Sequence, residues 1–252
     1  MGGGAYMLHA IRLKRLVMAA MMLTVLSLTA WLGMSAAGDV LTDDREITAI
    51  LDEGGYIPIQ EMPDYIWQAF LAVEDHRFMS HPGIDILSLG RALAADLKAG
   101  GMVQGGSTIT MQLARNLFLS HDKTIARKLK ESAIALHIER NYSKEQILSL
   151  YLNQIYFAHG TYGIEQAAQL YFGKTVRAGS KDQETISLSE AGILAAMPKA
   201  PERYSPLKNK ELAMERQQLV LNRMEELGFI SNEEKRLALS TEVTVVQADR
   251  HA

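Results

Sequence analysis

Glu74 is the first side chain in this sequence whose position suggests acid–base chemistry. Three apolar residues at helical spacing lead up to it on one face: Trp67, Phe70 and Leu71. A carboxylate on such a face is partly removed from water, which raises its pKa and makes it a better proton acceptor near neutral pH. The alternative is a surface carboxylate paired with Arg77 or His76.

A glycine-rich segment with two hydroxyl residues suits a bound anion. Gly105 and Gly106 permit a close approach of the backbone, and Ser107 or Thr108 would cap a helix whose first amide groups are free to bind phosphate. Polar residues then share one face of that helix: Thr108, Gln112, Arg115 and Asn116. A pyrophosphate would fit here, although an ordinary amphipathic helix with a good N-cap has the same pattern.

Positive charge is concentrated in the next segment, although the formal net charge of the chain is -3. Only Asp122 precedes Glu131 among these basic residues: Arg115, Lys123, Arg127, Lys128 and Lys130. Helical spacing predicts one charged face, formed by Lys123, Arg127, Lys130 and Glu131, with Leu129 on the opposite side. Such a face could hold a diphosphate leaving group. The alternative is a solvated face with ion pairs such as Arg127 with Glu131.

The elements that position these residues are predicted to be helices. Apolar spacing, caps and breakers predict helices over 63–75, 86–98, from 107 or 108 onward, 122–140, 144–152, 162–172, 187–197 and 210–228. Residues 102–106 are predicted to be a flexible loop. The segment 47–60 alone has strand character, ending in Tyr56, Ile57 and Ile59. The predicted fold class is therefore mainly α.

The N-terminal part predicts a membrane anchor. Leu16 to Gly38 is an uncharged, largely apolar run that is long enough to cross a bilayer as a helix. Basic residues precede it and acidic residues follow it, so the positive-inside preference places the N-terminus in the cytoplasm and the rest of the chain outside. A cleaved signal peptide is the competing interpretation, because Ser35, Ala36 and Ala37 resemble a cleavage site. Both interpretations export the domain.

Composition excludes several classes of function. The chain has 252 residues, of which 48% are hydrophobic and 22% charged, as expected for a globular domain with a sizeable core. The absence of cysteine removes disulfides and thiolate chemistry. The acidic balance gives no reason to expect nucleic acid. Two Ser-x-x-Lys matches, beginning at Ser120 and Ser205, lack the partner motifs of penicillin-binding transpeptidases.

These separate signals join in a resemblance to family 51 glycosyltransferases, the peptidoglycan glycosyltransferases. Five ordered motifs carry it: 74–85 (EDHRFMSHPGID), 105–116 (GGSTITMQLARN), 127–131 (RKLKE), 144–153 with 171–174 (KEQILSLYLN and YFGK), and 189–201 (SEAGILAAMPKAP). The resemblance covers about residues 47–235. Met111 and Ala158 depart from it, since glutamine and glycine are common at these positions.

The resemblance implies a lysozyme-like, mainly α, two-lobed domain close to the membrane, with Ile86 to Val103 as the segment that dips into it. It implies that Glu74 is the general base and Glu131 the second catalytic carboxylate. The substrate contacts carried over are Ser107, Thr108, Gln112, Arg115, Asn116, Lys123, Arg127 and Lys130. The expected organisation is a cytoplasmic N-terminus (1–15), an anchor (16–38), a connector (39–46), the glycosyltransferase domain (47–235) and a tail (236–252).

The implied activity is polymerisation of lipid II into β-1,4-linked glycan strands with release of polyprenyl pyrophosphate, at the outer face of the bacterial inner membrane. No second, transpeptidase domain is expected. The implied partners are lipid II, the growing lipid-linked strand, the membrane and other cell-wall synthesis proteins, with no nucleic acid. No organic cofactor is expected, and a divalent cation such as Mg2+ at Glu131 is left open. Two alternatives are a lytic glycosidase that uses Glu74 as an acid and a non-catalytic scaffold.

Overall fold

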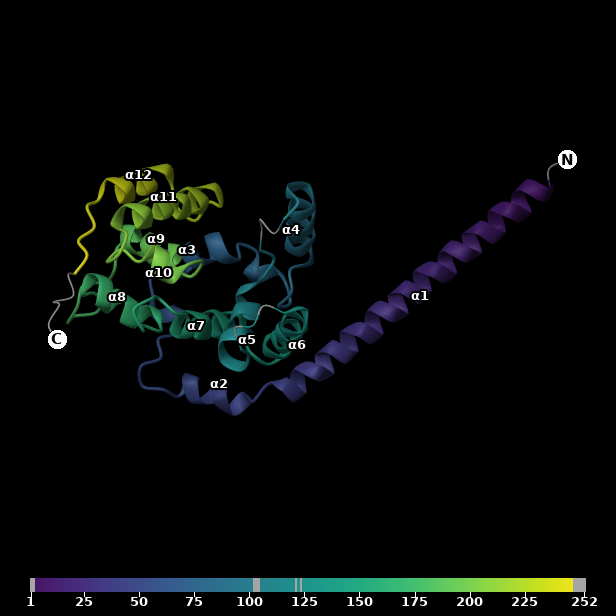
Figure 1. The fold of residues 1–252 in the computed structure, drawn as a ribbon, viewed down its shortest axis with the longest axis horizontal. Helices are drawn as coiled ribbons and strands as arrows, with labels where there is room; N and C mark the ends of the chain where they lie inside the picture. Colours follow the sequence, from purple (N-terminus) through teal and green to yellow (C-terminus); the bar gives the residue numbers. More distant parts are fainter. Residues whose placement is uncertain (1–2, 102–104, 121, 123, 247–252) are drawn as a thin grey trace.

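The computed structural model describes residues 3–101, 105–120, 122 and 124–246, and over these residues the chain is mainly helical, as predicted (Figure 1). The predicted loop at 102–106 and the predicted contact Lys123 fall largely or wholly outside the described residues. Two short 3-10 helices cover Ile59–Glu61 and Phe78–Ser80. The α-helices are α1 (Gly3–Leu41), α2 (Asp44–Leu51), α3 (Asp64–Glu74), α4 (Ile86–Ala99), α5 (Ile109–Phe118), α6 (Ile125–Asn141), α7 (Lys144–Gln154), α8 (Ile164–Phe172), α9 (Leu188–Ala196), α10 (Pro201–Tyr204), α11 (Lys210–Glu226) and α12 (Asn232–Ser240).

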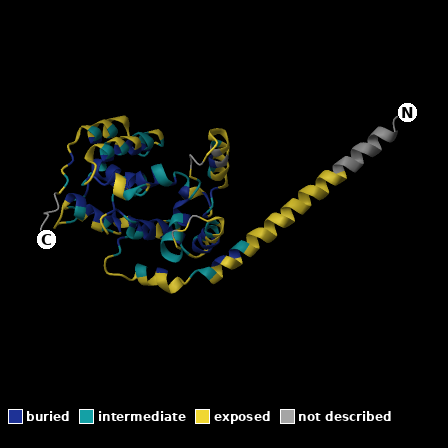
Figure 2. Ribbon diagram, in the orientation of Figure 1, coloured by how far each residue is buried: buried dark blue, intermediate teal, exposed yellow. Residues whose placement is uncertain are grey.

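The core lies between two groups of packed helices (Figure 2). Helix α5 packs on α6 and α7, while α9 packs on α3 and α11. Large side chains with no exposed surface fill the space between them, among them Phe70 of α3, Tyr151 of α7 and Tyr171 of α8. The rings of Phe70 and Phe157 meet edge to face with centroids 6.1 Å apart. This core fixes the end of α3 and the start of α5, where the candidate site residues lie.

Helix boundaries follow local capping chemistry. Thr108 accepts a hydrogen bond from the backbone N–H of Met111 and so caps α5. Ser143 and Gln146 form a reciprocal capping box at α7, and Ser187 and Glu190 form another at α9. The predicted helix starts therefore agree closely with the observed ones at α5, α7 and α9. Helix α12, which Ser231 caps, was not predicted.

The expectation of a strand over 47–60 is wrong. Asp43 caps a helix, α2, that takes up the first part of this segment. The following extended residues are paired with side chains of α7 instead of a neighbouring strand. The backbone N–H of Ile57 donates to Oδ1 of Asn153 across 3.1 Å, and that of Ile59 donates to Oγ of Ser149 across 2.9 Å. Side-chain partners thus satisfy the backbone groups that a sheet would have used.

Helix α1 extends away from the domain as one straight element (Figure 1). Its stretch Lys14–Leu41 is long and apolar enough to cross a membrane, and large apolar side chains along it are exposed (Figure 2). Helix α1 runs on to Leu41 and α2 begins at Asp44, so only Thr42 and Asp43 separate the two helices.

Candidate active site

Glu74 ends α3 and faces the polar side of α5. Its Oε2 accepts a hydrogen bond of 2.8 Å from Nε2 of Gln112. The hydroxyl of fully buried Tyr151 lies 3.4 Å from Oε1 of the same Gln112, which is a long contact. The alternative pairing of Glu74 with Arg77 is wrong, because Arg77 forms an ion pair with Asp85. Glu74 is therefore held by a neutral amide rather than neutralised by a cation in direct contact.

The environment of Glu74 favours its protonated form more than water does. Burial raises the pKa of its carboxyl, and this effect exceeds the opposing ones from the Gln112 hydrogen bond and from the charges of Lys199, Arg115 and Arg216. A carboxylate with a raised pKa accepts a proton more readily than an ordinary glutamate does. The sequence argument from the apolar stripe anticipated this direction.

Asp75, the residue after Glu74, connects three segments. Its carboxylate lies 2.9 Å from Nε2 of His81 and accepts a 3.1 Å hydrogen bond from the backbone N–H of Ile109. Asp75 and His81 are both buried. The end of α3, the turn that follows it and the first turn of α5 are consequently fixed to one another, and this arrangement places Gln112 opposite Glu74.

The side chain of Thr108 is buried, and its hydroxyl is hydrogen-bonded within the protein. Its hydroxyl donates to the carbonyl oxygen of Gly83 across 2.6 Å while it caps α5, and only 2% of the residue is exposed. Gly83 has φ = +85°, and a Cβ there would lie 2.9 Å from Cγ of Glu139, so the turn requires glycine. The structure gives Thr108 a positioning role in which its hydroxyl has no spare donor.

Glu131 lies on α6 with no exposed surface and is paired with two cations. Lys128 Nζ is 2.9 Å from one carboxylate oxygen, and Arg127 forms an ion pair with the other. Lys128 also donates to the hydroxyl of Ser107. Burial, together with the charges of Arg115 and Arg127, lowers the pKa of Lys128 to about 8. We refer to Arg115, Arg127 and Lys128 as the cation cluster.

The predicted charged face of α6 has a different composition in the structure. Leu129, expected on the buried side, is 57% exposed, whereas Lys128 turns inward to Glu131 and Ser107. Lys130 is exposed. The buried stripe of α6 begins at Glu131 itself, so a residue three positions before it shares its side of the helix. The i to i+3 relation of Lys128 and Glu131 was the available signal, and it was missed.

Arg115 lies close enough to both Glu74 and Lys128 to affect their protonation. Its charge acts both on the pKa of Glu74 and on that of Lys128, and its Nε is buried without a hydrogen-bond partner among the described residues. Arg115 also lines a cavity of about 430 Å³ together with Gln112 and Asn116 of the same helix. The other lining residues come from α7, the segments after α7 and α9, and the start of α10: Tyr151, Gln154, Ile155, Tyr156, Tyr162, Pro198 and Pro201.

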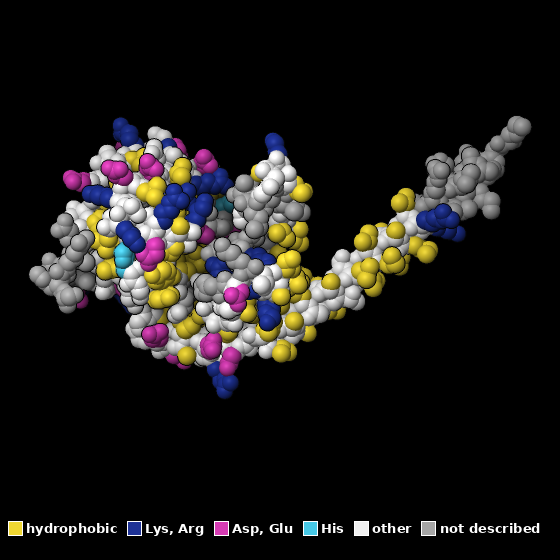
Figure 3. Space-filling view, viewed as in Figure 1, with side chains coloured by type: hydrophobic (Ala, Val, Ile, Leu, Met, Phe, Trp, Pro, Cys, Tyr) yellow, Lys and Arg dark blue, Asp and Glu magenta, His cyan; other side chains and the backbone are white. Residues whose placement is uncertain are grey.

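Basic residues that the sequence argument did not single out also lie near Glu74. Lys199 and Arg216 both act on the pKa of Glu74, and Arg223, two turns after Arg216 on α11, acts on the neighbouring His76. Figure 3 shows Lys and Arg side chains gathered over α11. Glu74 thus lies within range of positive charge from Arg115 of α5 and from Lys199 and Arg216 in the region of α10 and α11.

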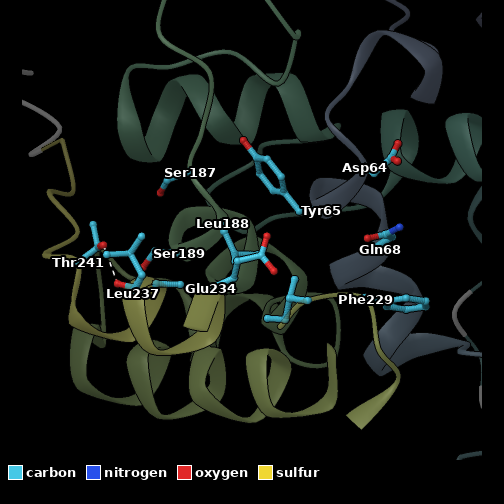
Figure 4. A pocket seen from close by; sticks show the side chains of 12 residues that line it. Asp64, Tyr65, Gln68, Ser187, Leu188, Ser189, Phe229, Glu234, Leu237 and Thr241 are labelled. Atoms are coloured by element: carbon cyan, nitrogen blue, oxygen red, sulfur yellow. Dashed lines mark hydrogen bonds between the residues drawn. The ribbon is translucent and has the colours of Figure 1, made fainter. Parts of the chain in front are cut away.

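A second cavity, of about 570 Å³, lies between α3, α9 and α12 (Figure 4). Asp64 and Tyr65, in the first turn of α3, line it, while Glu74 is the last residue of that helix, about 15 Å further along its axis. The lining residues include Asp64 and Glu234 but neither Lys nor Arg. This cavity therefore lacks the charge that a diphosphate requires.

The surroundings of Glu131 do not form a binding site for a metal cation. Its two oxygens already contact Arg127 and Lys128. Over the residues that the structure describes, no three His, Asp or Glu side chains come together in a group that could hold a metal. The donor set near Glu131 thus does not fit a resident divalent ion.

The arrangement combines a partly buried carboxylate of raised pKa, nearby cations and a cavity with polar lining residues, and comparison with known proteins gives it a family. The Transglycosylase family model matches residues 44–225, which is most of the chain. The chain belongs to the Transglycosylase family. The matched range contains Glu74, Glu131 and every residue of the cation cluster.

Relatives of this transglycosylase include two bacterial penicillin-binding proteins. The chain is 49% identical to penicillin-binding protein 1F of Bacillus subtilis over 178 residues, covering 71% of this chain and 24% of that protein. It is 39% identical to penicillin-binding protein 1A of Escherichia coli over 215 residues, covering 84% of this chain and 24% of that protein. The chain therefore spans about a quarter of the length of these curated relatives.

A solved structure also matches. The crystal structure of penicillin-binding protein 1A from Haemophilus influenzae aligns with a TM-score of 0.46 and 24% identity, over 78% of this chain and 19% of that one.

Proposed function

We propose that this transglycosylase polymerises lipid II, the lipid-linked cell-wall disaccharide, into β-1,4-linked glycan strands. The observation that carries the proposal is the placement of Glu74, a carboxylate of raised pKa, near the cations Arg115, Lys199 and Arg216. Membership of the Transglycosylase family supports it.

In this mechanism Glu74 takes the proton of the 4-hydroxyl of the acceptor's N-acetylglucosamine. That oxygen attacks C1 of the terminal N-acetylmuramic acid of the growing strand, and the bond from C1 to the diphosphate oxygen breaks. The polyprenyl pyrophosphate leaves with the electron pair, and the linkage inverts from α to β. The raised pKa of Glu74 suits this role, because the base must accept a proton as the new bond forms.

The cation cluster stabilises the leaving group. Negative charge on the diphosphate increases as the bond to C1 breaks, so the cluster of Arg115, Arg127 and Lys128 interacts more strongly with the transition state than with the ground state. Glu131 holds two of these cations in place. Ser107, Asn116 and Gln112 supply polar contacts, and exposed Lys130 adds positive charge on the helix that carries Arg127 and Lys128. Lys123 remains a proposed contact on the resemblance alone.

Two lipid-linked substrates each carry a diphosphate, and cations from two parts of the fold act on Glu74: Arg115, a member of the cation cluster, and Lys199 with Arg216. We assign the group of α5 and α6 to the leaving diphosphate, and Lys199 with Arg216 to the diphosphate that the acceptor retains. The cavity of about 430 Å³ beside Gln112 accommodates sugar units.

We also propose that α1 anchors the protein in the bacterial inner membrane, with its N-terminus in the cytoplasm and the domain on the outer face. Apolar side chains line α1, and Lys or Arg side chains lie at the N-terminal end of this apolar stretch (Figure 3). In the sequence Lys14 and Arg15 precede the apolar run, which places this end in the cytoplasm. Helix α4 exposes Ile86, Leu87 and Leu97 to solvent by 66–75%, as expected of a helix that enters the lipid surface.

The decisive experiment is polymerisation of labelled lipid II by the full chain and by its Glu74→Gln variant, with products separated by length. Polymer from the wild type and a loss of at least about 100-fold in the variant would support the proposal. Release of soluble fragments from preformed glycan would favour the lytic alternative. No product of either kind from folded wild type would favour the scaffold.

A further inference from the structure

The last turns of α1 are packed against α6 at unusually short range. Helix α1 is exposed along its apolar stretch, but Ser35 and Gly38 are buried where it reaches the domain. A Cβ on Gly38 would lie 2.2 Å from the carbonyl oxygen of Ala133 and 3.1 Å from Cβ of His137. Only glycine permits this approach of the two helix backbones, as at close helix pairs in membranes.

Polar side chains of α1, α2 and α6 hold the same contact together, and we refer to them as the polar clamp. Asp39 lies 2.7 Å from Nδ1 of His137 and forms an ion pair with Arg140, which also donates to the hydroxyl of Ser35. On the other side of the imidazole, Asp44 of α2 lies 3.0 Å from Nε2 of His137. The imidazole is therefore enclosed by carboxylates from the two N-terminal helices, and its side chain is only 8% exposed.

Helix α6 also carries part of the candidate active site. Ala133 is two residues after Glu131, and His137 is about 9 Å further along the helix axis than Glu131. Because a helix of this kind moves as a rigid rod, whatever fixes α6 to α1 also fixes Arg127, Lys128 and Glu131 relative to α1. A tether that was flexible at residue 38 would not do so.

We propose that the end of α1 is a positioning element for the reaction: its contact with α6 sets the height and tilt at which the cation cluster meets diphosphates at the membrane surface. This inference rests on the proposed function. It further requires that α1 is retained, and that the small residues Ser35 and Gly38 serve helix packing rather than cleavage by a signal peptidase.

Two glycines of α1 provide a matched test. Gly38→Leu forces a side chain into Ala133, whereas Gly33→Leu adds the same side chain where nothing lies within 4 Å of a Cβ. Both changes raise helix propensity and apolarity equally. Each variant is assayed for lipid II polymerisation in phospholipid vesicles and in detergent micelles. A bilayer constrains the orientation of α1 relative to the lipid surface, whereas a micelle does not.

We expect Gly38→Leu to lower the vesicle rate at least tenfold relative to its own micelle rate, and Gly33→Leu to leave this ratio unchanged. Equal losses in both media, wild-type rates in both media, or equal behaviour of the two variants would overturn the positioning role. A wild type that is inactive in both media would contradict the proposed function instead.

A second pair of variants tests the clamp. Arg140→Met removes the contacts with Asp39 and Ser35 and should lower the ratio of vesicle to micelle rates, while Arg140→Lys keeps the charge beside Asp39 but not the full set of contacts and should restore part of the ratio. An unchanged ratio in Arg140→Met would exclude the clamp. Independently of activity, the intact mass of the chain isolated from membranes should include residues 1–37, and a chain that begins after Ala37 would overturn the inference.

Discussion

The side-chain amide of Gln112 donates a 2.8 Å hydrogen bond to Oε2 of Glu74, and this bond links the polar face of α5 to the end of α3. A hydrogen bond to a carboxylate stabilises its charged form and lowers the pKa, whereas burial of Glu74 raises it. The amide therefore reduces the rise in pKa that burial causes at Glu74, the proposed base.

Replacement of Gln112 by alanine should move the acid side of the pH–rate profile to higher pH. Glu74 acts as a base only when deprotonated, so the rate falls as the pH drops through its pKa. Loss of the amide raises this pKa further, and a larger fraction of Glu74 is then protonated at a given pH. The measurement is kcat/KM for lipid II polymerisation against pH for the wild type and Gln112→Ala. Asn116→Ala, which changes another residue of the same cavity, is the control, and an unshifted acid side in Gln112→Ala would contradict the assignment.

Lys128 should produce the alkaline side of the same profile. Burial and the neighbouring arginines lower its pKa to about 8, so its positive charge is present below that pH and is lost above it. Lys128→Met should reduce kcat by about 10- to 100-fold at neutral pH, because a contact with the developing diphosphate charge is removed.

The informative companion is Lys128→Arg, which retains its charge at every pH of the assay. If Lys128 causes the alkaline fall in rate, this variant should hold its activity beyond pH 8 even where its rate at neutral pH is reduced. An alkaline side that is identical in the wild type and in Lys128→Arg would assign it to another group.

Asp75 should contribute mainly to stability. Its replacement by alanine leaves the buried His81 and the backbone N–H of Ile109 without their acceptor. The expected loss is about 2–5 kcal/mol in the free energy of unfolding, measured by urea titration. Asp52→Ala, at an exposed position after α2, should change it by less than about 0.5 kcal/mol. Equal stability of the two variants would show that Asp75 does not hold these segments together.

The helices were predictable because their signals are local. Apolar spacing and caps such as Thr108, Ser143 and Ser187 depend only on neighbouring residues. The segment that contains Ile57 and Ile59 was misassigned because its backbone partners, Asn153 and Ser149, are about 90 residues away. No local pattern shows that a side chain on a distant helix will replace a strand.

The site was predictable to the extent that motifs reveal it. Glu74 was located through its apolar stripe, and the pairing of Arg127 with Glu131 was one of two alternatives. Lys199 and Arg216 were missed because their charges reach Glu74 only through the fold. Ala158 shows the converse: the resemblance implies glycine here, and the structure is consistent with that, because φ is +68°, a conformation that costs other residues about 1–2 kcal/mol.

Exposed leucines on α4 should matter for activity at a membrane but not for folding. Leu87 and Leu97 are 66% and 75% exposed, so replacement of either by serine removes little from the core. Burial of one leucine in lipid contributes about 1.5–3 kcal/mol, which corresponds to a factor of about 10 or more in membrane partition. Leu87→Ser and Leu97→Ser should therefore raise the apparent KM for lipid II in vesicles while leaving the thermal midpoint unchanged. Leu237→Ser, at a 67% exposed position on α12, should leave the KM unaltered. If all three variants behave alike, helix α4 does not enter the lipid surface.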